Sequence, residues 1–311
     1  MTLASSLASG ILDRIGPTPM LRLRALPEAN SAQVWCKCEQ WSPSGSIMDR
    51  TALAMVNSAE QAGLIRPHQS TIVVASSGNT GIALALACRI KGYRLLVTMP
   101  ASMSLERRQL IVQYGAELAL TPAERLLPGA RDQAAEICRS RPGHVLLDQF
   151  AHPACAEAHR RTTAVELLAQ VEGPIDALVV GVGSGATLTG VGSVLKARFP
   201  AMAIVAVEPA RCAVLSGGPI GSHSIQGLGV GFVPDTLDRS LIDEVRTVED
   251  EQAQQTKVRL AQREGLLVGL SSGANVAIAL EVARALGRNR RVLTFLCDTG
   301  ERYFSLEGRI G

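Results

Sequence analysis

Short apolar runs alternate with longer segments in which apolar residues recur at helical spacing. The short runs are rich in Val, Ile, Leu and Ala, which is typical of buried strands. The expected strands are residues 34–39, 71–75, 93–99, 116–120, 145–147, 177–180, 203–208 and 291–297. The expected helices are residues 49–62, 82–90, 105–114, 128–139, 188–198, 250–264 and 273–286.

This alternation of strands and helices indicates an α/β fold, with helices on both faces of mainly parallel sheets. A glycine-rich turn from strand to helix occurs in each half of the chain, at residues 76–81 and 183–187. Ligands of such folds bind beside turns of this kind, at the carboxyl ends of the strands. The pattern therefore predicts two α/β lobes with a cleft between them.

The composition supports a packed protein and argues against several functions. The 311 residues are 47% hydrophobic and 19% charged, which allows a sizeable core and is unlike a disordered chain. A net charge of +3 without a basic run gives no indication of nucleic-acid binding. We expect no membrane partner and no signal peptide, because no stretch is long and apolar enough for either. A cytoplasmic location is expected.

The cysteines and histidines do not suggest a metal site. The seven cysteines are scattered, so we expect free and mostly buried thiols. The histidines form no cluster, and we expect them at the surface or in loops. They are His68, His144, His152, His159 and His223.

The turn at residues 183–187 is suited to an anion. A strand ends there, glycines expose backbone N–H groups, and a helix begins, which together form a cradle for a phosphate. A tight turn that needs glycine only for its backbone conformation is the alternative. The sequence has neither the Gly-Lys-Ser/Thr of a Walker A loop nor the Gly-x-Gly-x-x-Gly spacing.

The turn at residues 76–81, Ser-Ser-Gly-Asn-Thr-Gly, clusters hydroxyl and amide groups at a helix start. Such a cluster favours a carboxylate ligand. Ordinary capping of the helix would need one of these side chains, not four, so we favour the binding interpretation.

Residues 42–50, Ser-Pro-Ser-Gly-Ser-Ile-Met-Asp-Arg, resemble the pattern Asn-Pro-Ser/Thr-Gly-Ser-x-Lys-Asp-Arg. That pattern marks the cysteine synthase and β-synthase family of enzymes, which depend on pyridoxal 5′-phosphate (PLP). Both glycine-rich turns are similar to motifs of this family, as are residues 224–234, residues 269–274 and the Thr-Gly-Glu-Arg-Tyr at 299–303. The resemblance covers nearly the whole chain.

The resemblance implies a tryptophan synthase β-like fold with PLP in the cleft. It implies a smaller mobile lobe, residues 36–148, that carries the Ser-Gly-Asn-Thr loop. Residues 1–35 plus 149–311 form the larger lobe, which carries the phosphate loop. A homodimer is also implied.

The same resemblance assigns roles to individual residues. Asn79 bonds the ring hydroxyl oxygen of PLP, and Ser271, in preference to Ser272, faces the pyridine nitrogen. The phosphate ligands are Gly183, Ser184, Gly185, Ala186 and Thr187. Ala186 stands where the family usually has glycine. If this position needs a positive φ, alanine adds backbone strain there. The amino-acid substrate contacts Ser76, Ser77, Gly78, Thr80, Gln149 and Gly227.

Met48 stands where the family has the lysine that holds PLP as a Schiff base and moves the α-proton of the substrate. Only four lysines exist to replace it, namely Lys37, Lys91, Lys196 and Lys257. Arginine cannot, because its guanidinium stays protonated. We therefore expect PLP to bind non-covalently, or as a preformed external aldimine with an amino acid.

The sequence leaves three explanations of Met48 open. In the first, the lysine of an active enzyme was replaced deliberately. In the second, a natural homologue lost it and kept the fold for binding or regulation. In the third, the chain is an active enzyme that uses PLP without a covalent lysine, or a different ligand in the same cleft. The implied activity is β-replacement, in which an O-activated L-serine and sulfide or another small nucleophile give a β-substituted alanine. We expect this activity to be impaired here; the alternative is an inactive homologue that binds PLP or an amino acid.

Overall fold

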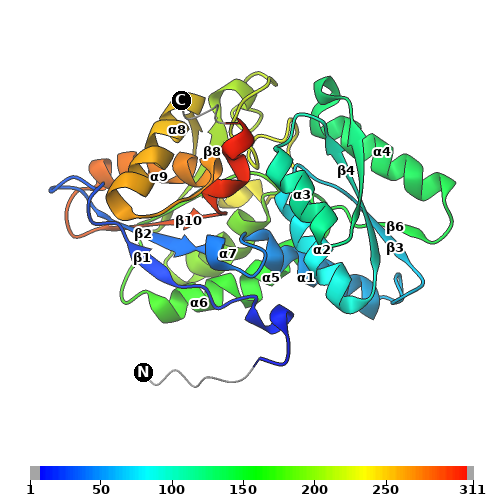
Figure 1. Cartoon of the computed structure of the whole chain (residues 1–311). Coiled ribbons are helices and arrows are strands. Elements are labelled where there is room, and N and C mark those ends of the chain that lie inside the picture. Colours follow the sequence, from blue (N-terminus) through cyan, green and yellow to red (C-terminus); the bar gives the residue numbers. More distant parts are fainter. Residues whose placement is uncertain (1–7, 307–311) are drawn as a thin grey trace.

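The computed structural model describes residues 8–306 and has two lobes side by side (Figure 1). Within these residues the strands form a six-stranded and a four-stranded sheet, both mainly parallel and both covered by helices. The predicted α/β fold with two lobes is confirmed. No helix among the described residues is long and apolar enough to cross a membrane.

The larger sheet has the strand order β1-β2-β10-β7-β8-β9. β1 runs antiparallel to β2, and every other pair is parallel. Its strands are β1 (Met20–Arg22), β2 (Gln33–Cys38), β7 (Ala177–Gly181), β8 (Ala203–Pro209), β9 (Glu244–Val248) and β10 (Arg291–Leu296). The helices of this lobe are α6 (Thr163–Gln170), α7 (Ala186–Arg198), α8 (Asp250–Arg259) and α9 (Leu270–Leu286).

The smaller sheet has the order β5-β4-β3-β6 and is parallel throughout. Its strands are β3 (Thr71–Ala75), β4 (Arg94–Pro100), β5 (Glu117–Thr121) and β6 (His144–Leu146). Its helices are α1 (Met48–Gln61), α2 (Asn79–Lys91), α3 (Leu105–Gln113) and α4 (Leu126–Ser140), and α5 (Ala154–Arg161) contacts both α1 and α7. Shorter helical turns are η1 (Ile11–Arg14), η2 (Glu39–Trp41), η3 (Ala123–Arg125), η4 (Ala210–Cys212), η5 (Arg239–Leu241), η6 (Leu260–Glu264) and η7 (Gly300–Leu306).

The first predicted lobe boundary needs a correction. Residue 36 falls inside β2, and all of β2 pairs with β10 in the larger sheet. Residues 36–38 therefore belong with the larger lobe, because their backbone hydrogen bonds are made there. The mobility of the smaller lobe stays a prediction.

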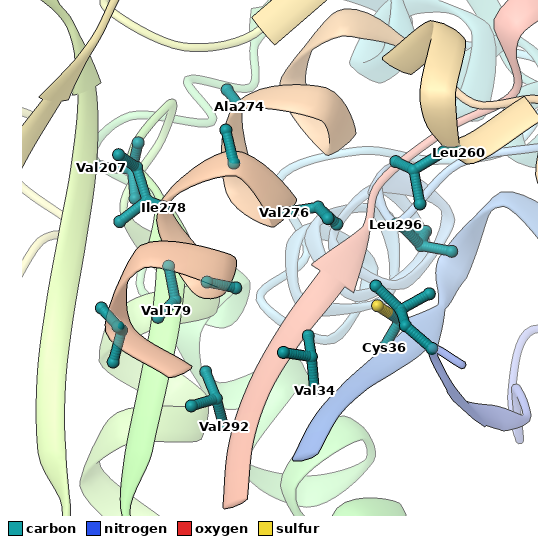
Figure 2. Packing of buried hydrophobic residues seen from close by; sticks show 14 of the residues in the cluster. Val34, Cys36, Val179, Val207, Leu260, Ala274, Val276, Ile278, Val292 and Leu296 are labelled. Atoms are coloured by element: carbon teal, nitrogen blue, oxygen red, sulfur yellow. The ribbon is translucent and has the colours of Figure 1, made fainter. Parts of the chain in front are cut away.

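Successive residues of the central strands point into different cores, as strand geometry requires. Figure 2 shows one such core, in which Val34 and Cys36 of β2 and Val292 of β10 lie beneath Val276 and Ile278 of α9. The alternate residues of β7, β8 and β10 pack against α6 and α7 on the other face. All seven cysteines are free and five of them are buried, which confirms the expectation for the thiols.

Candidate active site

A cavity between the lobes is lined by residues from both glycine-rich turns. Gly183, Ser184 and Gly185 join the end of β7 to the start of α7, and the first N–H groups of a helix have no partner within it. A Cβ atom at Gly183 would lie 2.1 Å from the carbonyl oxygen of Gly227, so only glycine allows this approach. Gly183 therefore allows residue 227 to pack directly against this turn. The free N–H groups at the start of α7 are suited to a phosphate.

The positive φ of this turn falls on Gly185, at 81°, and not on Ala186. Ala186 is the first residue of α7 and is fully buried against the core of the smaller lobe. The departure from the usual glycine at Ala186 therefore adds no backbone strain here.

Thr187, the second residue of α7, is held by a histidine that sequence reasoning placed at the surface. His159 of α5 is 1% exposed, so that expectation is wrong. Its Nε2 lies 3.2 Å from Thr187 Oγ1, and its Nδ1 lies 2.9 Å from Thr163 Oγ1. Burial, and then the charge of Arg50, lower the pKa of His159 to about 3, against an opposing effect of Glu166. The ring is therefore neutral beside the phosphate loop.

The Ser-Ser-Gly-Asn-Thr-Gly turn joins β3 to α2, and α2 begins at Asn79. Ser77, Asn79 and Thr80 line the cavity. Ser76 does not, because its Oγ accepts hydrogen bonds from the N–H groups of Gly78 and Gly81, both at 3.0 Å. Ser76 thus braces the turn from within.

Gln149 is also on the cavity wall. Its Nε2 donates to the carbonyl oxygen of Ala75 at 3.0 Å, and its Oε1 accepts from Thr80 Oγ1. These bonds fix the amide next to Ser77 and Thr80. Thr80 uses its only O–H on Gln149, so the donors that remain for a carboxylate are the Ser77 hydroxyl and the second N–H of the Gln149 amide.

Asn79 is oriented by two residues from the C-terminal part of the chain. Its Nδ2 donates to Asp298 Oδ2 at 2.6 Å, and its Oδ1 accepts from Arg302 Nη1 at 2.9 Å. Asp298 is fully buried and also accepts from the hydroxyl of Tyr303. Sequence reasoning noticed the Thr-Gly-Glu-Arg-Tyr motif but gave these side chains no role.

Arg107 of α3 is a second residue that sequence reasoning missed. Its guanidinium lies on the cavity wall, 4.5 Å from the centre of the Tyr303 ring. Nη1 donates to the carbonyl oxygen of Ser77 at 3.0 Å and to Gln226 Oε1 at 2.6 Å. Arg107 therefore connects the carboxylate turn of the smaller lobe to the loop 224–234.

Ser271 and Ser272, at the start of α9, have side chains in different surroundings. Ser271 lies on the cavity wall, whereas the Oγ of Ser272 accepts from the backbone N–H of Cys297 at 2.8 Å. Cys297 is on the wall too, and burial raises the pKa of its thiol to about 12. The side of the cavity next to Ser271 therefore carries neutral groups.

Met48, the first residue of α1, lines the cavity and packs against the cores of both lobes. None of the four lysines, all of which lie in the described range, is on this wall. Lys37 is fully buried elsewhere, with its ammonium bonded to Glu166 and Gln170 and to the carbonyl oxygen of Thr18. The pKa of Lys37 is lowered overall, because burial lowers it more than the hydrogen bond to Glu166 raises it.

The arrangement is typical of one class of protein: one whose site, between two α/β lobes, is suited to a phosphate-bearing ligand beside a carboxylate. The N–H cradle at Gly183–Gly185 fits the phosphate of PLP, and Asn79 and Ser271 lie where a ring could be held. The cavity wall has no amine, so the residues fit PLP only without a covalent bond from this chain.

Comparison with known proteins gives the family. Residues 11–298 match the family described as pyridoxal-phosphate dependent enzyme, and the chain belongs to it. It is 46% identical over 304 residues to a cysteine synthase of Staphylococcus aureus (strain Mu50 / ATCC 700699), with 97% of each chain covered. This family uses PLP.

Solved structures agree with this assignment. The structure of O-ureido-L-serine synthase has a TM-score of 0.93 and 41% identity, with 98% of each chain covered. A lysine-to-alanine mutant of that enzyme, with O-ureido-L-serine bound, matches with the same TM-score and identity over 98% of this chain and 96% of the other. An O-acetylserine dependent cystathionine beta-synthase from Helicobacter pylori has a TM-score of 0.90 and 33% identity, over 96% of this chain and 98% of that one.

Proposed function

We propose that the chain is a β-replacement protein of the cysteine synthase type, built to convert an O-activated L-serine into a β-substituted alanine. It keeps the binding site for PLP and the amino acid and lacks the amine that the reaction needs. One observation carries this proposal: Met48 occupies the wall, and the cavity lining contains no Lys, His, Asp or Glu. No group of suitable basicity therefore faces the substrate.

Bound PLP supplies an electron sink for a carbanion at the amino acid's Cα. The residues of this chain bind and orient. The N–H groups of Gly183–Gly185 hold the phosphate. Ser77 and Gln149 hold the substrate carboxylate, and Thr80 orients the Gln149 amide through its hydrogen bond. The hydroxyl of Ser271 offers a neutral partner to the ring nitrogen, which limits the ring's positive charge. The thiol of Cys297 keeps its proton near neutral pH.

Restoring the amine tests this proposal. Met48→Lys should attach PLP covalently at position 48, and borohydride reduction followed by peptide mass mapping should locate the adduct there. General acid–base catalysis by one residue contributes typically ~10²–10⁴-fold, so turnover of O-acetylserine or O-phosphoserine with sulfide should rise by at least that factor. Met48→Gln, which is polar but has no basic amine, is the matched control.

Three results would contradict the proposal. One is normal turnover by the unaltered chain together with an adduct on Lys37 or another lysine. Another is Met48→Lys forming its adduct at position 48 yet converting no activated serine. The third is an equal gain of activity in Met48→Gln, because that side chain cannot form the covalent link.

A binding protein without catalysis is the second candidate, and the packing of Met48 favours it. The thioether contacts the apolar cores of both lobes, as expected of a residue that stabilises the protein and performs no chemistry. The lysine-to-alanine mutant of O-ureido-L-serine synthase, which was solved with O-ureido-L-serine bound, supports binding without the amine. This candidate predicts that the unaltered chain binds PLP or an amino acid tightly and that Met48→Lys lowers stability without gaining turnover.

The homodimer implied by the resemblance and the expected cytoplasmic location remain predictions. A light-scattering mass in solution would decide the first.

A further inference from the structure

A second cavity adjoins the candidate active site. Its volume is about 240 Å³, far above the roughly 10–15 Å³ that a cavity needs to hold one water. It shares Ser77, Gly227, Leu228 and Val230 with the wall of the active-site cavity. A molecule bound there would lie next to the reacting amino acid, and it could be much larger than sulfide.

The wall of this cavity is mainly apolar. Met103, Leu126, Leu127 and Ile220 contribute apolar side chains. None of the residues along it, all within the described part of the chain, is Asp, Glu, Lys or Arg. The guanidinium of Arg107, which is bonded to Ser77 and Gln226, is already paired with Asp298 at 3.5 Å. An ionised group that entered would therefore lose hydration without gaining an unpaired opposite charge, which is unfavourable.

One polar atom on this wall lacks a partner. His223 lines the cavity, and its Nε2 lies 3.0 Å from the carbonyl oxygen of Gly229. A carbonyl oxygen only accepts, so Nε2 carries the proton, and in the neutral ring Nδ1 is an acceptor. Nδ1 is buried and has no hydrogen-bond partner among the described residues. A ligand with an S–H or N–H donor would satisfy it.

We infer that this cavity receives the second substrate, and that this substrate is an uncharged organic nucleophile with an apolar body and one S–H or N–H group. The inference rests on the proposed function, because that reaction supplies the need for a nucleophile. Size argues against sulfide alone, since sulfide would leave most of the cavity unfilled. The uncharged wall argues against an amino-acid nucleophile, whose carboxylate and ammonium groups would both be left unpaired.

Three thiols of similar length separate these possibilities. Butane-1-thiol is neutral, 3-mercaptopropionate is an anion and cysteamine is a cation. Their affinities for the unaltered chain are measured under reducing conditions by ligand-observed NMR, which needs no turnover. The neutral thiol should bind at least about tenfold more tightly than either charged thiol, because leaving a charge unpaired costs more than the ~1.4 kcal/mol of a tenfold change.

A charge introduced at the rim tests the location. Ile220 is 65% exposed, so Ile220→Arg should fold, and it should raise the affinity for 3-mercaptopropionate and lower that for cysteamine. Ile90 is 55% exposed on α2, away from this cavity, and Ile90→Arg adds the same charge as a control. Equal affinities for the three thiols, or the same shift in both variants, would overturn the inference.

These outcomes are distinct from those for the proposed function. If Met48→Lys captures PLP at position 48 and turns over activated serine while the thiols show no preference, only the inference about the nucleophile fails. If the thiol preference is found and the Met48→Lys chain gives no turnover, the cavity's selectivity holds and the β-replacement function fails.

Discussion

Replacing His159 by glutamine should make the folded protein less sensitive to acid. Burial and Arg50 hold the pKa of His159 at about 3, below its ordinary value of 6.5. In the unfolded chain this imidazole binds a proton below about pH 6.5, whereas in the folded protein it stays neutral until about pH 3. The stability that depends on the neutral ring is therefore complete above pH 6.5 and is lost as the pH falls.

The size of this effect follows from the same two pKa values. Each unit of difference corresponds to about 1.4 kcal/mol, so the full loss approaches about 5 kcal/mol and amounts to about 3 kcal/mol by pH 4. Glutamine does not titrate and still offers a donor and an acceptor to Thr163 and Thr187. At neutral pH the His159→Gln chain should be less stable, because the buried imidazole ring is gone. On acidification it should lose less stability, because no group at position 159 takes up a proton on unfolding.

Urea unfolding of both chains from about pH 7.5 to pH 4 measures the difference in free energy of unfolding, in which the other titrating groups cancel. His144→Gln is the control, because His144 is only partly buried, at the start of β6. A difference between the unaltered chain and His159→Gln that stays constant with pH would refute the reasoning, since His159 would then titrate alike in both states.

Two further substitutions have definite expected outcomes. Gly183→Ala should weaken PLP binding by at least about tenfold, because the new Cβ would lie 2.1 Å from the carbonyl oxygen of Gly227. An absorbance titration measures the affinity for PLP, and an unchanged affinity would rule out this loop as the phosphate site. Arg50→Met should lower the free energy of unfolding by about 3–5 kcal/mol in urea, because it leaves the buried carboxylate of Glu39 unpaired and weakens the pairing of Glu166. Adding Glu39→Gln should recover part of that loss, and a double variant no more stable than the single one would exclude the unpaired charge as its cause.

The sequence predicted those elements whose apolar pattern is strong. β3, β7 and β10 are almost wholly buried, so they appear as continuous apolar runs. β9 went unpredicted because it lies at the sheet edge and exposes charged residues. Helices α5 and α6 are short and adjacent, and the predicted pattern gave neither of them.

The candidate site was predictable where its residues are consecutive. Both glycine-rich turns reach the cavity because each joins a strand to a helix at the carboxyl edge of its sheet. His159, Asp298 and Arg107 could not be placed in this way, because they act through partners far away in the sequence: Thr187, Asn79 and Gln226 respectively. Hydrophobic periodicity contains no information on such pairings.

The surroundings of Met48 suit either a methionine or the lysine that the proposed reaction needs. A lysine that must attack an aldehyde works best when desolvation lowers its pKa, so that part of it is neutral near pH 7. Position 48 lies between the apolar cores of both lobes, which is an environment of that kind. The same environment accepts a methionine readily, because the thioether is apolar and adaptable. The phosphate cradle and the carboxylate turn make their hydrogen bonds without residue 48. If the proposed function is right, substitution at this position separates binding from catalysis, and Met48→Lys measures the difference.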